Sequence, residues 1–105
     1  MACWDAKYHY WYIRTSQLDT SITTLVPLPS HPSYPSAHSC LSSAGTTVLA
    51  SLFPEEARQF NELTKASGES RIAAGLHYRF DCEAGDEIGR RAAALALAKM
   101  APALR

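Results

Sequence analysis

Apolar residues in this chain recur three and four positions apart, the spacing of a helix that buries one face. No stretch alternates apolar and polar residues in the way of a half-buried strand. The pattern therefore predicts an all-α fold of about four helices, packed as a bundle. These helices are expected at about residues 5–15, at 36–53, from Pro54 to a C-cap at Gly68, and at about 81–100.

The first predicted helix is rich in aromatic residues. Tyr8, Trp11 and Tyr12 fall at positions i, i+3 and i+4, which indicates a stripe that packs against the core. Lys7 and Arg14 lie two helical turns apart, so the helix would place both cations on one face. Four prolines then occur up to residue 35 and predict a loop from about residue 16, because proline disfavours helical backbone.

The central helix is predicted to begin at Ser36, because a serine hydroxyl suits the N-cap position. Residues 42–47 are all small and would let another helix approach closely. The apolar stripe expected on this helix comprises Leu41, Ala44, Val48, Leu49 and Leu52.

The rest of the chain indicates two helices joined by a turn. Pro54 and the acids after it favour a helix start, and Gly68 is the expected C-cap. Residues 70–77 would form a turn or short helix, and the last helix would run from near Asp81 until Pro102 ends it. The expected inward positions are Ala57, Phe60 and Leu63 in the first of these helices and Ile88, Ala92 and Leu95 in the second.

Length and charge narrow the classes of function. A chain of 105 residues forms at most one domain. Its formal net charge is zero, which argues against a nucleic-acid partner or a membrane-surface partner. The longest apolar run is interrupted by Lys99 and Pro102, and a membrane span needs about 20 apolar residues, so no span is predicted.

The cysteines and the first residues of the chain indicate the cellular compartment of the protein. Cys3, Cys40 and Cys82 are odd in number and lack metal-ligand or CxxC spacing, so they predict free thiols in a reducing compartment. The first residues are charged and aromatic, unlike a signal peptide. A cytoplasmic location is therefore the expectation.

Three short stretches carry the residue types of an anion-binding catalytic site. Three cations suit an oxyanion with several negative oxygens, such as phosphate or vanadate. Two histidines supply a nucleophile or ligand and a general acid, and a carboxylate one turn further along suits the group that orients an imidazole. The stretches are Lys7 with Arg14, then Ser36-Ala37-His38, then Arg71, His77 and Asp81.

Each feature taken singly also has a plain structural explanation. A lone lysine or arginine is usually a solvated surface charge, and Ser36 could be an N-cap that binds no ligand. His77 and Asp81 could simply stand at a helix start. His9 and His31 have no assigned partner and are interpreted as structural. The three stretches in order, in a chain without a basic excess, favour the site over these explanations.

In this order the stretches resemble the signature of the superfamily that joins type 2 phosphatidic acid phosphatases, bacterial acid phosphatases and vanadium-dependent haloperoxidases. The similarity extends from residues 5–8 to about Arg91, and segments 32–38 and 70–81 are most similar to the soluble haloperoxidase branch. Two departures stand out. Thr15 replaces a proline, and Ala37 replaces a glycine that presents its N–H to the anion.

The resemblance implies a role for each residue of the signature. His77 would hold vanadate through one ring nitrogen, or attack phosphorus in a phosphatase, while Asp81 fixes its tautomer. His38 would be the acid–base partner. The oxyanion would be held by Lys7, Arg14, Ser36, Ala37 and Arg71.

Three hypotheses of function follow. The first is a vanadium-dependent haloperoxidase that holds vanadate and oxidises a halide with hydrogen peroxide. The second is a soluble phosphomonoesterase with a histidine nucleophile, no cofactor and a phosphate ester as substrate. The third is an inactive truncated piece, because the resemblance implies larger bundles and residues 1–105 would be one partial domain without its N-terminal helices.

Overall fold

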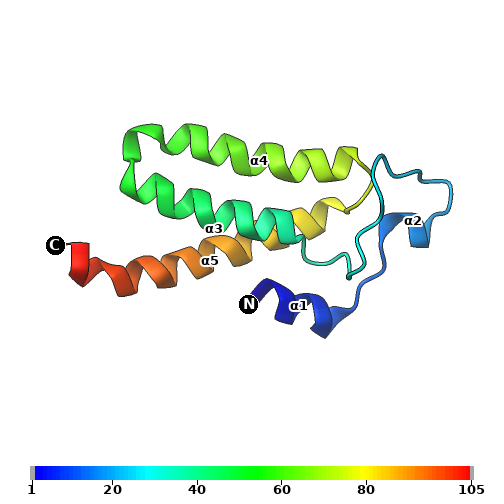
Figure 1. The fold of residues 1–105 in the computed structure, drawn as a ribbon, viewed down its shortest axis with the longest axis horizontal. Helices are drawn as coiled ribbons and strands as arrows, with labels where there is room; N and C mark the ends of the chain where they lie inside the picture. Colours follow the sequence, from blue (N-terminus) through cyan, green and yellow to red (C-terminus); the bar gives the residue numbers. More distant parts are fainter. Residues whose placement is uncertain (1, 105) are drawn as a thin grey trace.

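The computed structural model describes residues 2–104, with side chains up to residue 101. Every regular element in this range is helical, which confirms the all-α prediction. Figure 1 shows the long helices that follow residue 36 running alongside one another, with the loop that precedes them at one end. In chain order the elements are α1 (Ala2–Tyr10), α2 (Thr15–Leu18), α3 (Ala37–Leu52), the 3-10 turn η1 (Pro54–Glu56), α4 (Ala57–Ala73) and α5 (Arg79–Leu104).

Helix α3 lies at the centre of the bundle, and α4 and α5 both pack against it. Its start is set locally, because the Ser36 hydroxyl accepts a hydrogen bond from the backbone N–H of Ser39 at 3.3 Å. The small residues of α3 serve both neighbours: Ser42 donates to Ser67 of α4 at 3.1 Å, and Ser43 donates to the carbonyl of Asp86 on α5 at 2.8 Å. The predicted start of this helix is confirmed.

Glycine allows α5 to approach the start of α3 closely. A Cβ atom at Gly85 would lie 2.5 Å from the carbonyl oxygen of Ser36, closer than non-bonded atoms can come. The inward face of α5 is therefore lined by small residues. Two of the three predicted inward positions were wrong, since Ala92 is exposed and Leu95 is 68% exposed, whereas Ile88 is half-buried.

The first predicted helix was too long. Helix α1 ends at Tyr10, and Trp11 has a φ of 50°, which takes the chain out of helical conformation. Arg14 is therefore not on α1, and the two cations do not share a helix face. The prediction that the aromatic stripe packs against the core is also wrong, because Tyr8, Trp11 and Tyr12 are all exposed.

Three other helix boundaries differ from the predictions. The loop expected from residue 16 starts later, because α2 occupies Thr15–Leu18. Gly68 does not end α4, which continues to Ala73; Gly75, with a φ of 80°, takes the left-handed conformation just beyond it. Helix α5 starts at Arg79 and passes Pro102.

The apolar stripe predicted for α3 is only partly covered. Leu41 is 72% exposed and Leu49 40% exposed, whereas the buried positions of this helix are small or polar. Leu63 of α4 is exposed as well. Among the described residues, no helix is long and apolar enough to cross a membrane.

Candidate functional site

The predicted site residues come from five places in the fold. Lys7 lies on α1, and Arg14 directly precedes α2. Ser36, Ala37 and His38 form the start of α3, and Arg71 lies in the last turn of α4. His77 stands in the turn before α5, and Asp81 lies in the first turn of α5.

His77 and Asp81 form the buried centre of this arrangement. Nδ1 of His77 lies 2.9 Å from Oδ2 of Asp81, and both side chains are almost fully buried. The same carboxylate oxygen accepts the backbone N–H of Tyr78 at 3.1 Å, which ties Asp81 to the start of α5. Because Asp81 is an acceptor, it favours the tautomer that carries the proton on Nδ1 and leaves Nε2 with its lone pair.

Arg14 reaches that second ring nitrogen. Its Nη1 lies 3.1 Å from Nε2 of His77 and donates to the carbonyl of Leu76 at 3.0 Å. On the other side of the guanidinium, Nε donates to the carbonyl of His31 at 3.1 Å. Desolvation by burial and the nearby positive charge of Arg14 outweigh the opposing effect of Asp81 and lower the pKa of His77, which favours the neutral ring.

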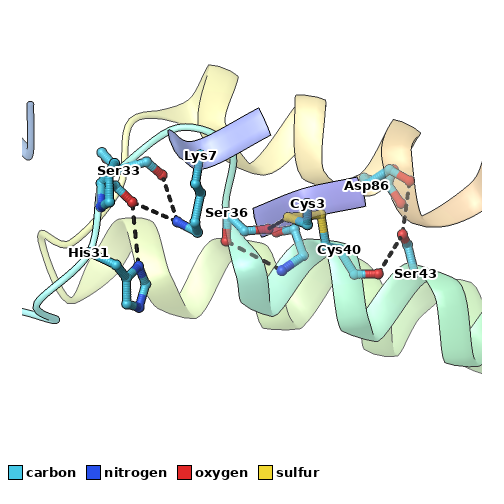
Figure 2. Close-up of a disulfide and its surroundings, with 10 residues drawn as sticks. Cys3, Lys7, His31, Ser33, Ser36, Cys40, Ser43 and Asp86 are labelled. Atoms are coloured by element: carbon cyan, nitrogen blue, oxygen red, sulfur yellow. Dashed lines mark hydrogen bonds between the residues drawn. A yellow bond between two sulfur atoms is a disulfide. The ribbon is translucent and has the colours of Figure 1, made fainter. Parts of the chain in front are cut away.

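Lys7 is fully buried, and the proline-rich loop holds its ammonium group. Nζ donates to the carbonyl of Pro32 at 2.6 Å and reaches that of Ser33 at 3.5 Å. Figure 2 shows Lys7 beside Ser33. Desolvation first, and then the charge of Arg14, lower the pKa of Lys7 from 10.5 to about 8. The positive charges of this site therefore repel one another inside the fold.

The start of α3 offers backbone donors that have no acceptor among residues 2–104. The first residues of a helix have no intrahelical acceptor for their N–H groups. The N–H of Ser39 is bound to the Ser36 hydroxyl and that of Cys40 to the Ser36 carbonyl. Ala37 and His38 occupy the two positions before them, where N–H groups and the positive end of the helix dipole suit an anion.

Arg71 and His38 complete the predicted set. Nε of Arg71 is buried and has no hydrogen-bond partner in the part of the chain that the structure describes, so this guanidinium has an unmet donor. The His38 side chain is exposed, and no hydrogen bond joins its ring to the residues described. Desolvation, then the charges of Arg71 and Lys7, lower the pKa of His38, so the ring lies within electrostatic range of both cations.

Two residues in contact with this set were not predicted as site residues. His31 was interpreted as structural, yet its Nδ1 lies 3.1 Å from Nη2 of Arg14. The hydroxyl of Ser33 donates to Oδ2 of Asp81. Ser33 stands inside a stretch that carries the family resemblance, which was the only signal in the sequence that pointed to it.

A disulfide fastens α1 to the start of α3. Cys3 is bonded to Cys40, as Figure 2 shows, and Cys82 is buried as a free thiol. The prediction of three free thiols was therefore wrong for two of them, because the bond joins positions 37 residues apart that no short spacing reveals. Cys3 is one helical turn before Lys7, so the bond also holds the segment that carries this cation.

The donor set suits an oxyanion better than a free metal ion. Among the residues described, no group of three or more His, Cys, Asp or Glu side chains could hold a metal ion. The site instead gathers two buried cations, a third cation with an unmet donor, and one imidazole nitrogen that carries a lone pair. Such donors match the oxygens and the central atom of phosphate or vanadate.

Comparison with known proteins identifies the class. The family model of the PAP2 superfamily matches residues 3–104, and this chain belongs to that superfamily. A bacterial vanadium-dependent iodoperoxidase of known structure superposes with a TM-score of 0.79 at 28% sequence identity, over 93% of this chain and 29% of its own. The non-specific acid phosphatase of Salmonella typhi is 35% identical over 57 residues, which are 54% of this chain and 23% of that protein.

The chain thus spans less than a third of either relative. The superfamily prediction is confirmed, and the likeness to a haloperoxidase extends over nearly the whole fold described here. Both relatives are named as enzymes, one for peroxidase activity and one for phosphatase activity.

Proposed function

We propose that this chain forms the oxyanion site of a vanadium-dependent haloperoxidase, which oxidises halide with hydrogen peroxide. The observation that carries the proposal is the placement of Arg14 against Nε2 of His77, whose Nδ1 is bound to Asp81. A cation beside the lone-pair nitrogen of an oriented imidazole suits an anion whose central atom bonds to that nitrogen. The iodoperoxidase likeness supports the choice of vanadate over phosphate.

The charges of the site are consistent with an anionic ligand. Lys7 and Arg14 both lie within electrostatic range of the Asp81 carboxylate, and both also lie within range of the Arg71 guanidinium. Burial of unbalanced positive charge is unfavourable, and a multiply charged oxyanion would offset the repulsion between these side chains. The unmet donor of Arg71 would bind its oxygens, and so would the N–H groups of Ala37 and His38, which have no acceptor in the described part of the chain.

Each residue of the chain would have a distinct task. His77 would bond the central atom through Nε2, with its ring held by Asp81. The three cations and the start of α3 would bind the surrounding oxygens, and His38 would move protons at the exposed side of the site. When bound, vanadate would supply the electrophilic centre that activates hydrogen peroxide toward halide.

A soluble phosphomonoesterase is the second candidate, and the 35% sequence identity to the Salmonella acid phosphatase over 57 residues favours it. Nε2 of His77 would attack phosphorus while the ester oxygen leaves as an alcohol with a proton from His38. Water would then release phosphate and free the imidazole. The same site serves both candidates, because vanadate adopts the five-coordinate geometry of the phosphoryl-transfer transition state.

The experiment that tests the proposal measures anion binding and catalytic activity separately. Vanadate and phosphate are titrated against the purified chain. Halide oxidation is then assayed after loading with vanadate, and phosphoester cleavage is assayed in the vanadate-free chain. We expect both anions to compete for one site, and we expect halide oxidation to require vanadate. Absence of binding by both anions would contradict the proposed site, whereas phosphoester cleavage without halide oxidation would establish the second candidate.

A further inference from the structure

Ser33 contacts two parts of the site at once. The residue is completely buried in the proline-rich loop, and its backbone N–H is bound to the carbonyl of Tyr12 at 2.9 Å. Its hydroxyl donates to Oδ2 of Asp81, while its carbonyl accepts the ammonium group of Lys7 at 3.5 Å. Figure 2 shows Ser33 and Lys7 joined in this way.

The hydrogen bonds to Asp81 are strongly unequal between its two oxygens. Oδ2 is the acceptor for Ser33, for the backbone of Tyr78 and for the ring of His77, whereas Oδ1 is buried and has no partner among the residues described. A partial rotation of the carboxylate would lengthen all three of these bonds together. Ser33 supplies the only side-chain donor among those partners other than His77 itself.

We propose that Ser33 is a positioning residue for His77: its hydroxyl fixes the rotational orientation of the Asp81 carboxylate against Nδ1. Through that carboxylate it holds the ring orientation and the proton on Nδ1, so that Nε2 keeps the lone pair that faces Nη1 of Arg14. The proposal rests on the proposed function for the identity of the anion. The contact itself exists independently of any anion.

The side-chain and backbone contacts of Ser33 can be separated by substitution. Ser33→Ala removes the hydroxyl and keeps the carbonyl that faces Lys7. Ser33→Thr restores a hydroxyl at the same position. Ser30→Ala is the matched control, because Ser30 lies in the same loop and is exposed.

The first measurement is nitrogen NMR of the histidine rings in the anion-free chain. In the wild type we expect the His77 ring to hold its proton on Nδ1. We also expect the Ser33 hydroxyl proton to exchange slowly with solvent and to lie close to the His77 ring. Ser33→Ala should give a ring that averages between tautomers, and Ser33→Thr should restore the locked signal. A freely exchanging hydroxyl proton in the wild type, or an unchanged His77 signal in Ser33→Ala, would overturn the proposal.

The second measurement is vanadate affinity. Loss of a group that orients a ligand typically costs about 10- to 100-fold in affinity, and Ser33→Ala should fall in that range while Ser30→Ala matches the wild type. Unchanged vanadate affinity in Ser33→Ala would also overturn the positioning role. If the wild type bound neither vanadate nor phosphate, the proposed function would fail, and the ring signal would still decide whether Ser33 positions His77.

Discussion

Nη1 of Arg14 and Nε2 of His77 lie 3.1 Å apart, although the two residues are 63 positions apart in the chain. The guanidinium is fixed in this place by its bonds to the carbonyls of Leu76 and His31. A planar fork can satisfy these partners together, whereas an ammonium group acts as a point charge. This relationship makes the shape of Arg14, as well as its charge, important for the site.

Arg14→Lys should therefore weaken vanadate binding by about 100-fold, since one preorganised donor to an oxyanion is worth about 3 kcal/mol. The measurement is a vanadate titration of the variant beside Arg58→Lys, a control at an exposed arginine on α4. Equal affinities for the two variants would show that charge alone is needed at residue 14.

His77 and His38 should respond differently to replacement. His77→Ala removes the nitrogen that would bond the central atom and should abolish tight vanadate binding. His38→Ala should change that affinity by no more than about twofold, because its side chain is exposed and makes no hydrogen bond in the part of the chain described. Turnover should fall sharply in both variants.

The measurement is vanadate titration of each variant, followed by assays of halide oxidation and phosphoester cleavage. His9→Ala is the control, since this histidine is exposed and lies outside the site. Similar losses of vanadate affinity in the His77 and His38 variants would contradict the division of roles.

Local features of the sequence predicted the start of α3 and the pairing of His77 with Asp81. An N-cap serine acts within its own turn, and residues four apart on a helix start are neighbours in space. Helical spacing likewise predicted the three long helices α3, α4 and α5, since each shows its period over several turns, whereas the first predicted helix was placed at residues 5–15 and α1 ends at Tyr10.

The position of Arg14 could not be predicted in the same way. Its place depends on carbonyls of His31 and Leu76, which lie far along the chain and are brought near only by the folded loop. The buried faces were mistaken for a related reason. The small residues at 42–47 correctly predicted a close helix contact, which Ser43 makes with α5. Large apolar residues such as Leu95 were nevertheless assigned to the interior of α5, where small ones such as Gly85 lie instead.

Oxyanion affinity should fall as the pH rises through about 8, because the pKa of Lys7 is lowered to about 8 and binding needs the ammonium form. The lowered value arises from burial and from Arg14 and Arg71, against the opposing charge of Asp81. Phosphate becomes more negative over this range, so a loss of affinity would come from the protein. Phosphate titrations between pH 6 and about 10 measure it.

The lowered pKa of Lys7 also makes the free energy of unfolding depend on pH. In the unfolded chain Lys7 keeps its proton up to about pH 10.5, whereas in the folded chain it keeps the proton only up to about pH 8. Protonated Lys7 therefore lowers the free energy of unfolding by its full amount below pH 8. Its contribution should become more favourable as the pH rises from about 8 to 10.5. Lys7→Met should lack both effects, and Lys65→Met, at an exposed lysine, should retain them.

Reduction of the Cys3–Cys40 disulfide should lower both stability and anion affinity. The bond closes a loop of 37 residues, and cross-links of this size stabilise a fold by roughly 4 kcal/mol. Helix α1 otherwise makes few contacts with α3 and α5, so its release would displace Lys7 from the loop carbonyls that hold it. Denaturant unfolding and vanadate titration, each with and without reductant, measure the two losses.

Serine variants identify the bond responsible. Cys3→Ser and Cys40→Ser should each reproduce the effect of the reductant and become insensitive to it, whereas Cys82→Ala should keep the sensitivity, because Cys82 is a free thiol. The loss of vanadate affinity should approach that of Lys7→Met if the disulfide acts by holding this cation in place. A reduced chain that unfolds more easily but binds vanadate as tightly as before would show that the bond stabilises α1 without positioning Lys7.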